Sequence, residues 1–344
     1  MNKPCINTNI YDTMVLSGGG TRGLCCLGVL YYLQSNHLID HVENYIGTSV
    51  GSMINYLIII GYTGPEIVTY ICKERVLEKF LHPNIQSFLN GTGVISYHEI
   101  QRHLEKLTLD KAHSYFTMKT LYERYGKKLY CCTYNRTKQK VEYIGYDNYP
   151  DCPCLVAIRM SANIPFVFDS FKYIDSYYVD GGIVDNFPLE FAKKVGKKMI
   201  CIGSSFEVSE FSISQPLIVK VIDLLLIQAG ENLRRTINNC RKSDIYDIIE
   251  LKTDILKYLS SSVTHQLDMF SSGYRICEEF FNMKYSNNDM NKTEDGVKIE
   301  DAEIEDAEID DAEIEDAEIE DAEIEEAEIE EAEIEEAEIE EAEI

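Results

Sequence analysis

Residues 14–60 read MVLSGGGTRGLCCLGVLYYLQSNHLIDHVENYIGTSVGSMINYLIII, and this segment indicates the fold class most clearly. A short apolar run at Met14–Leu16 leads into three glycines, and apolar residues then recur at helical spacing over Thr21–Gln34. A second short strand, Val42–Ile46, ends at a glycine and is followed by an apolar helix over Ser52–Ile60. This order predicts an α/β fold with a mostly parallel central sheet and helices on both faces.

The rest of the chain continues the alternation less regularly. Residues 64–125 are expected to be mainly helical. The elements expected after them are a hairpin at Leu129–Tyr134 and Val141–Ile144, a helix at Leu155–Met160, short strands at Tyr173–Ile174 and Tyr177–Val179, a helix at Phe187–Val195, a core strand at Lys198–Ser204 and helices from 216 to 284. We predict one domain over residues 10–285, with a motif-bearing core at 12–205 and a helical part at 206–285, followed by a polar linker at 286–299.

A repetitive tail carries the net charge. The 344 residues include 32 Lys+Arg against 59 Asp+Glu, a formal net charge of −27. Residues 300–344 are nine five-residue repeats with three acids each, so residues 1–299 are neutral, with 32 acids and 32 bases. This repeat length makes no apolar stripe on a helix or a strand, and so dense a charge prevents a packed core, so we expect a disordered tail. The neutral body argues against nucleic acid as the main partner.

Cysteine usage and apolar content bear on location. The eleven cysteines show no Cys-x-x-Cys pair or zinc-ligand spacing, and residues 1–12 hold no secretory-type apolar run. We therefore expect reduced thiols, a cytoplasmic protein, and no bound metal or cofactor. The longest apolar stretches, Met53–Tyr62 and Leu217–Ala229, are too short or too charged to span a bilayer. We interpret both as core helices, with an apolar approach surface for lipid as the alternative.

The first segment with chemical character is the glycine-rich turn from Gly18 to Gly23. Glycines between a strand and a helix allow close backbone approach, and their exposed N–H groups attract an anion, either a phosphate or the oxyanion of an acyl-transfer intermediate. The spacing Gly18-x-Gly20-x-x-Gly23 also matches the dinucleotide fingerprint, which needs an acid at the end of the second strand. That strand ends in Gly47-Thr48-Ser49 instead, so the nucleotide alternative is disfavoured.

The second segment, Gly47-Thr48-Ser49-Val50-Gly51, has the pattern G-x-S-x-G between a strand and a helix. Its glycines permit the sharp turn that exposes a nucleophilic serine, and the following helix adds positive potential. The alternative is a tight turn with a capping serine. The third segment, Asp180-Gly181-Gly182, follows a tyrosine-rich strand and either directs a carboxylate into a neighbouring site or forms an ordinary turn.

Taken together, the three segments provide a nucleophile, a base and an oxyanion hole, the parts that a serine hydrolase needs. In their order and spacing the sequence resembles the patatin-like phospholipases, the family that includes plant patatins and calcium-independent phospholipases A2. Weaker resemblance lies in Arg159–Pro165 and Asn186–Leu189, and the whole likeness covers residues 12–205.

The resemblance implies a Ser–Asp dyad without histidine. Ser49 would be the nucleophile and Asp180 the proton acceptor. The backbone N–H groups of the glycine turn, chiefly Gly19 and Gly20 with neighbouring Gly18, would form the oxyanion hole. Arg22 would serve loop structure or head-group attraction, and the supporting motif glycines would be Gly23, Gly47, Gly51, Gly181 and Gly182. The implied substrates are phospholipids or other lipid esters, met at a transient membrane or micelle surface.

Two further alternatives are another kind of hydrolase and a protein without catalytic activity. A Ser-Asp-His triad of the α/β-hydrolase order would use His265, but that residue lies in a plain polar segment and too few strands precede Ser49. A catalytically silent protein of the same fold, acting as an interaction module, is disfavoured because every dyad residue is present.

Overall fold

The computed structural model describes residues 11–78, 96–207, 217–240, 243–254 and 262–292. Its eight described strands form one sheet in the order β5-β6-β3-β2-β1-β7-β8, with β4 paired to β3. The strands are β1 Thr13–Leu16, β2 Asn44–Thr48, β3 Lys128–Asn135, β4 Lys140–Gly145, β5 Phe171–Tyr173, β6 Ser176–Asp180, β7 Met199–Glu207 and β8 Tyr246–Asp254.

The sheet has a parallel half and an antiparallel half. Strand β1 pairs in parallel with β2 and β7, while β2 pairs in parallel with β3 and β7 with β8. The pairings β3–β4, β3–β6 and β5–β6 are antiparallel. The prediction of a mostly parallel central sheet is therefore confirmed.

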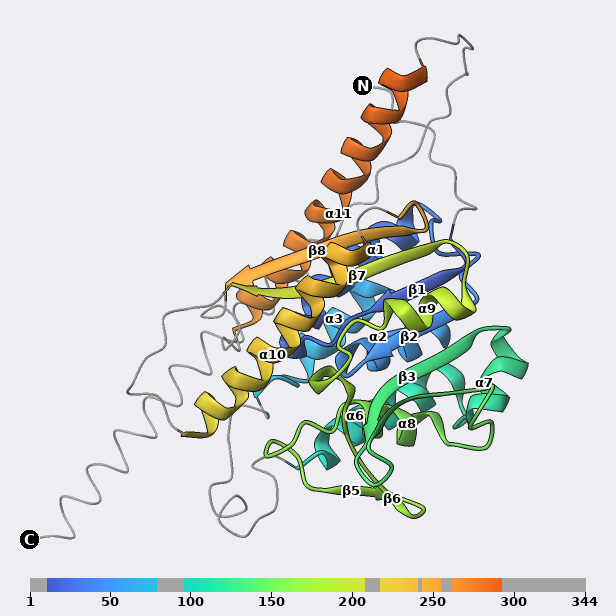
Figure 1. Ribbon diagram of the computed structural model, residues 1–344, viewed down its shortest axis with the longest axis vertical. Coiled ribbons are helices and arrows are strands. Elements are labelled where there is room, and N and C mark those ends of the chain that lie inside the picture. Colours follow the sequence, from blue (N-terminus) through green and yellow to red (C-terminus); the bar gives the residue numbers. More distant parts are fainter. Residues whose placement is uncertain (1–10, 79–95, 208–216, 241–242, 255–261, 293–344) are drawn as a thin grey trace, which may run out of the picture. The chain divides into compact units, whose positions relative to one another are not determined.

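Helices cover both faces of the sheet, as the sequence predicts. Figure 1 shows α9 and α10 on one face and α1, α3 and α11 on the other. The described helices longer than one turn are α1 Gly23–Ser35, α2 Val50–Ile59, α3 Gly64–Lys73, α6 His98–Ala112, α7 Met118–Tyr125, α8 Cys154–Ser161, α9 Leu189–Val195, α10 Leu217–Cys240 and α11 Val263–Lys292. Strand β1 shows the same division, because Met14 and Leu16 enter the larger core and Val15 the smaller one.

Helix α1 is buried along nearly its whole length because it lies under α3 and α11. Two glycines let α1 and α11 approach closely. A Cβ at Gly28 would lie 1.9 Å from the Phe270 carbonyl oxygen, and one at Gly273 would lie 1.8 Å from the Cys25 carbonyl oxygen. This contact anchors the long C-terminal helix to the first helix of the motif-bearing core.

Several sequence predictions need correction. Strand β8 lies within the region 216–284, which was expected to be helical throughout; its residues pair in parallel with β7, and that pairing outweighs local helical preference. Helix α11 runs to Lys292, into the predicted linker. Ile174, predicted in a strand, occupies the β5–β6 turn with a positive φ of 54°. Strand β2 begins two residues later than predicted.

The predictions for the polar linker and the acidic tail concern residues that the structure largely does not describe. Residues 293–299 of the linker and the acidic tail at 300–344 lie outside the described residues. None of the described helices is long and apolar enough to cross a membrane. The apolar helix α2 is a core element, with Ile54 and Leu57 in the larger core, as interpreted from the sequence. The ten cysteines of the described segments are all free thiols.

Candidate active site

The glycine turn and Ser49 meet at the carboxyl edge of the parallel strands. Leu16 at the end of β1 pairs with Gly47 of β2, so the residues that follow each strand emerge side by side. A Cβ built on Gly18 would lie 3.2 Å from the Ser49 Cβ. The structure therefore brings together the first two segments singled out in the sequence.

Ser49 occupies a sharp strand-to-helix turn. Its backbone has φ 55° and ψ −124°, a left-handed region that non-glycine residues rarely adopt, and α2 begins at the next residue. The turn is closed by glycines at both ends: a Cβ at Gly47 would lie 2.5 Å from the Gly51 carbonyl carbon, and one at Gly51 would lie 2.6 Å from the Leu16 carbonyl oxygen. Such strained residues concentrate at functional sites because the surrounding structure must hold them in place.

A second serine supports this turn. The Ser49 N–H donates to the Ser161 Oγ at 3.0 Å, and the Ser161 hydroxyl donates to the Cys132 carbonyl at 2.6 Å. Ser52 Oγ lies 2.9 Å from the same hydroxyl. Sequence reasoning gave Ser161 no role, although it lies in the segment of weaker resemblance, Arg159–Pro165. Its position at the end of α8 fixes the backbone of Ser49 against β3.

Asp180 reaches the site on a strand that runs the other way. Thr48 pairs with Cys132 of β3, and the next residue of β3, Thr133, pairs with Asp180 at the end of β6. The carboxyl group therefore arrives beside Ser49. Asp180 is only 4% exposed, its Oδ1 accepts a 2.7 Å hydrogen bond from the Gly182 N–H, and its own N–H donates to the Asn163 carbonyl at 2.9 Å.

Burial dominates the electrostatics of this carboxyl. Loss of water raises the pKa of Asp180 to about 6, while interaction with the Ser49 hydroxyl and the Gly182 N–H acts in the opposite direction. Its Oδ2 makes no hydrogen bond of ordinary geometry with the described residues, so this oxygen is available to accept a proton. The groups that act on Asp180 include Ser49 and no histidine.

The N–H groups of the glycine turn differ in their hydrogen bonding. The Gly18 N–H donates to Asn186 through both the carbonyl oxygen, at 3.3 Å, and Oδ1, at 3.1 Å, and the Asn186 amide donates back to the Gly18 carbonyl. Among the described residues, no hydrogen-bond acceptor takes the N–H groups of Gly19 and Gly20. Gly20 needs to be glycine because its φ is 58°.

The remaining predicted residues have structural surroundings. Arg22 is buried and donates from Nη1 to the Ser205 carbonyl of β7 at 3.1 Å, which favours the loop-structure role over head-group attraction. A Cβ at Gly23 would lie 2.9 Å from Val50 Cγ2. A Cβ at Gly181 would lie 2.4 Å from the Cys132 carbonyl, so this glycine lets the Asp180 turn approach β3.

The competing interpretations find no support in this geometry. His265 belongs to α11, which packs against α1, α3 and β8, and it makes no described interaction with Ser49 or Asp180. The acid required by the nucleotide fingerprint is missing from the end of β2, which is Thr48. Across the ranges that the structure describes, no cluster of three or more His, Cys, Asp or Glu side chains is suited to a metal ion.

Comparison with known proteins agrees with the geometry. A family model described as Patatin-like phospholipase matches residues 14–193. The chain is 31% identical over 263 residues to Probable lipid hydrolase 463L of Invertebrate iridescent virus 6, covering 72% of this chain and 89% of that protein. It is 27% identical over 198 residues to Lysophospholipase NTE1 of Meyerozyma guilliermondii, covering 54% of this chain and 12% of that protein.

Among solved structures, VipD from Legionella pneumophila is similar with a TM-score of 0.47 and 17% identity, over 79% of this chain and 67% of that one. The family match and the viral relative decide the assignment. The chain belongs to the patatin-like phospholipase family, a family of serine hydrolases that act on lipids.

Proposed function

We propose that the protein hydrolyses carboxylic esters of lipids, as a phospholipase of the A type, with Ser49 as nucleophile and Asp180 as its base. The observation that carries the proposal is a serine on a strained turn whose hydroxyl interacts with a buried carboxyl group, that of Asp180. Both groups lie at the edge where two N–H groups of the glycine turn have no acceptor among the described residues.

The reaction then proceeds by acyl transfer. Ser49 Oγ bonds to the ester carbonyl carbon as its proton moves to Asp180 Oδ2, and the carbonyl oxygen becomes an oxyanion. The N–H groups of Gly19 and Gly20 stabilise that oxyanion. When the intermediate collapses, the C–O bond to the alcohol breaks and Asp180 returns the proton to the leaving oxygen. A water molecule then bonds to the acyl carbon as its proton moves to the same carboxylate. The bond to Ser49 Oγ breaks, Asp180 returns the proton to that oxygen, and the fatty acid leaves.

The environment of Asp180 makes it a better base than a free aspartate. A carboxylate whose pKa is about 6 holds a proton more tightly than one at the ordinary value of 3.8, so it accepts the serine proton at a smaller energetic cost. Since Asp180 must be ionised to act, kcat/KM for an ester should rise with pH through about 6 and then level off.

The substrate class is proposed from the family and the named relatives. The chain's relatives are named as a lipid hydrolase and a lysophospholipase, so we propose lipid acyl esters, met at a membrane or micelle surface in the cytoplasm. The alternative is a silent interaction protein of the same fold. The strained turn at Ser49 disfavours it, because a protein without catalytic need for the turn gains nothing from holding it.

The direct test is labelling with a fluorophosphonate probe, followed by mass spectrometric mapping of the adduct. We expect the adduct on Ser49, its loss in Ser49→Ala, and strongly slowed labelling in Asp180→Asn. Both variants should keep the wild-type circular dichroism spectrum. An adduct elsewhere, or equal labelling of Asp180→Asn, contradicts the dyad. Absence of any adduct on folded protein, with and without lipid vesicles, supports the silent alternative.

A further inference from the structure

Two neighbouring turns extend beyond the edge of the sheet at which Ser49 lies. Strand β2 ends at Thr48, opposite Cys132, whereas β3 continues for three more residues to Asn135 before the turn at 136–139. At about 3.3 Å per residue, β3 projects roughly 10 Å past the end of β2. The β3–β4 turn therefore lies beyond the carboxyl edge, on the same side as the candidate active site.

The β5–β6 turn lies next to it. The Tyr177 N–H donates to Thr137 Oγ1 at 3.0 Å, and the Arg136 N–H donates to the Tyr177 carbonyl at 2.8 Å. Because β6 runs inward to Asp180, its first residues lie farthest out, and the turn residues Ile174 and Asp175 form the tip of this hairpin. Two turns, joined by hydrogen bonds, thus project together.

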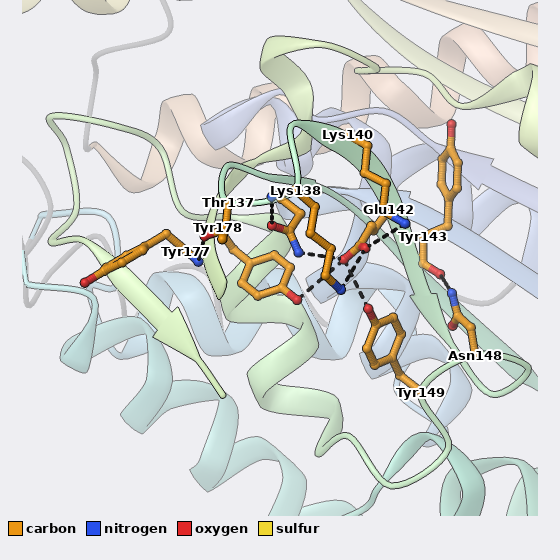
Figure 2. Close-up of polar contacts among 10 residues, drawn as sticks. Thr137, Lys138, Lys140, Glu142, Tyr143, Asn148, Tyr149, Tyr177 and Tyr178 are labelled. Carbon is orange, nitrogen blue, oxygen red and sulfur yellow. Dashed lines mark hydrogen bonds and ion pairs between the residues drawn. The ribbon is translucent and has the colours of Figure 1, made fainter. Parts of the chain in front are cut away.

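A buried carboxylate holds the two hairpins together. Glu142 of β4 accepts from Asn135 at 3.0 Å and from the hydroxyls of Tyr149 and Tyr178 at 3.2 and 3.5 Å. Figure 2 shows Tyr178 directed toward Glu142 and Tyr177 directed away from it, as expected for successive residues of a strand. Hydrogen bonds to the Glu142 carboxylate therefore connect the strands that lead into both projecting turns.

The outer residues are apolar where a turn is ordinarily polar. Ile174 is 72% exposed and Tyr177 is 50% exposed. Ile174 also has a φ of 54°, a left-handed conformation in which a β-branched side chain is strongly disfavoured and asparagine or glycine is usual. The Ile174 side chain is thus mostly exposed beside the described residues, and its exposure and backbone strain point to a contact outside the chain.

Basic residues surround this apolar tip. The β3–β4 turn contains or adjoins three basic residues, Arg136, Lys138 and Lys140. The Lys172 Nζ lies 6.0 Å from the centroid of the Tyr177 ring. Lys138 and Lys140 pair with Glu142, whereas Arg136 and Lys172 form no ion pair within the described ranges. Two exposed basic residues thus lie near an exposed isoleucine and tyrosine, with one exposed acid, Asp175, at the same tip.

We propose that these two turns form a docking surface for a phospholipid bilayer, in which Ile174 and Tyr177 enter the interface while Arg136 and Lys172 contact lipid phosphates. A tyrosine at head-group level and lysine or arginine beside it are the residues that bilayer interfaces favour. A protein partner is disfavoured because a stable interface buries about 800 Å² on each side, more than two narrow tips offer. The proposal deepens the proposed function, since docking would bring lipid esters to the edge where Ser49 lies.

The test measures binding separately from catalysis. Ser49→Ala protein is sedimented with phosphatidylcholine vesicles, with and without one-third phosphatidylglycerol, at physiological salt, where charges beyond about 8 Å are screened. Adding Ile174→Asn should weaken partitioning about tenfold, as expected when a side chain of this size leaves an apolar environment. Adding Arg136→Gln with Lys172→Gln should weaken it about thirtyfold on the anionic vesicles and little on the neutral ones.

Controls separate docking from folding and from chemistry. Asparagine suits the left-handed backbone at position 174, so Ile174→Asn should melt no lower than its parent. Met283→Asn, at a 64% exposed position on α11, should leave partitioning unchanged. With Ser49 intact, Ile174→Asn should hydrolyse a soluble short-chain ester at the wild-type rate and vesicle lipid about tenfold more slowly.

Each outcome bears on one proposal. Three outcomes would overturn the docking surface. Ile174→Asn could partition onto vesicles as well as its parent, or Met283→Asn could lose as much partitioning as Ile174→Asn. The protein could also bind an acidic protein while not binding vesicles. A different result would overturn the proposed hydrolysis and leave the docking surface supported. In that result the intact protein hydrolyses no ester but still binds vesicles, and the Ile174→Asn variant loses this binding.

Discussion

The parallel and antiparallel halves of the sheet contribute to the candidate site in different ways. In the parallel half, β1 and β2 each end in a turn that begins a helix, and the glycine turn and Ser49 are adjacent because the strands are in register. In the antiparallel half, β6 enters from beyond the edge and ends at Asp180, opposite Thr133 of β3. The position of Ser49, the proposed nucleophile, therefore depends on local turn geometry. The position of Asp180, the proposed base, depends on strand pairing between segments that are distant in the sequence.

The largest expected effect comes from the antiparallel half, at Asp180. Asp180→Asn should lower kcat for an ester about 10³-fold, because the proposed general base is lost while the Gly182 N–H keeps an oxygen acceptor. The same change should stabilise the fold at about pH 8. The difference between a pKa of about 6 and the ordinary 3.8 corresponds to about 3 kcal/mol of unfavourable energy when the buried carboxylate is ionised.

The sign of the pH dependence follows from the raised pKa. Folded protein binds this proton more tightly than unfolded protein, so the penalty is absent below about pH 3.8 and is complete above about pH 6. Denaturant melts of wild type and Asp180→Asn at several pH values check this. A stability difference that does not grow between pH 4 and 7 would contradict a buried, ionised Asp180.

In the parallel half, the substitution expected to disturb the Ser49 turn most directly is at Gly51. In Gly51→Ala the new Cβ would lie 2.6 Å from the Leu16 carbonyl oxygen and 2.8 Å from that of Ser17, both backbone atoms that cannot move alone. We expect a loss of about 1–3 kcal/mol in the free energy of unfolding, together with loss of probe labelling at Ser49.

A matched control is Gly126→Ala. Gly126 has a φ of 65°, and a Cβ added there would have no atom within 4 Å, so alanine would strain the backbone without a clash. The change should cost about 1 kcal/mol and leave labelling unchanged. Equal labelling of Gly51→Ala and Gly126→Ala would show that the turn tolerates displacement and that its tight packing is irrelevant to Ser49.

A smaller effect is expected at Glu142, which braces the antiparallel half. Burial acts to raise the pKa of Glu142, but the hydrogen bonds from Asn135, Lys140 and its other partners outweigh burial and the pKa lies below the ordinary 4.5. Glu142→Gln should therefore cost about 1–3 kcal/mol at neutral pH. Because the folded pKa is lowered, this stabilisation is present above about pH 4.5 and is lost as the pH falls through the folded value.

The control for Glu142 is Glu99→Gln. Glu99 forms an exposed ion pair with Arg102 at 2.8 Å, and removal of such a pair should cost less than about 1 kcal/mol. Thermal melts at neutral and acidic pH compare the two variants. If both lose the same small amount, the network around Glu142 contributes no more than a surface pair and does not brace the strand that carries Asp180.

The smallest effect is expected at His265, which lies in neither half of the sheet. His265→Ala should leave ester hydrolysis within about twofold of wild type, because the residue lies on α11 and the groups that act on Asp180 include no histidine. Steady-state kinetics on a soluble ester measure this. A loss of a hundredfold or more would restore the triad interpretation.

The sequence predicted the strand–turn–helix segments β1–α1 and β2–α2 and the β3–β4 hairpin well, because each of these features is local. The turn at 47–51 must be sharp since it carries a serine between two glycines, and alternating strands and helices indicate a parallel sheet. Prediction failed where pairing overrides local preference. Strand β8 is held by β7 in a region expected to be helical, and Ile174 is placed in a turn that its own preferences oppose.

The sequence by itself therefore determined the fold class, the strand–turn–helix at Ser49 and the three segments with chemical character. Only the tertiary structure decided that Asp180 lies beside Ser49, that Ser161 supports the turn, and that Asn186 occupies the Gly18 N–H. The physical reason is the separation in sequence between the residues that interact. Turns and helices follow from interactions between near neighbours, whereas strand register and the burial that raises the pKa of Asp180 depend on residues that are distant in the sequence, such as Ser49 beside Asp180.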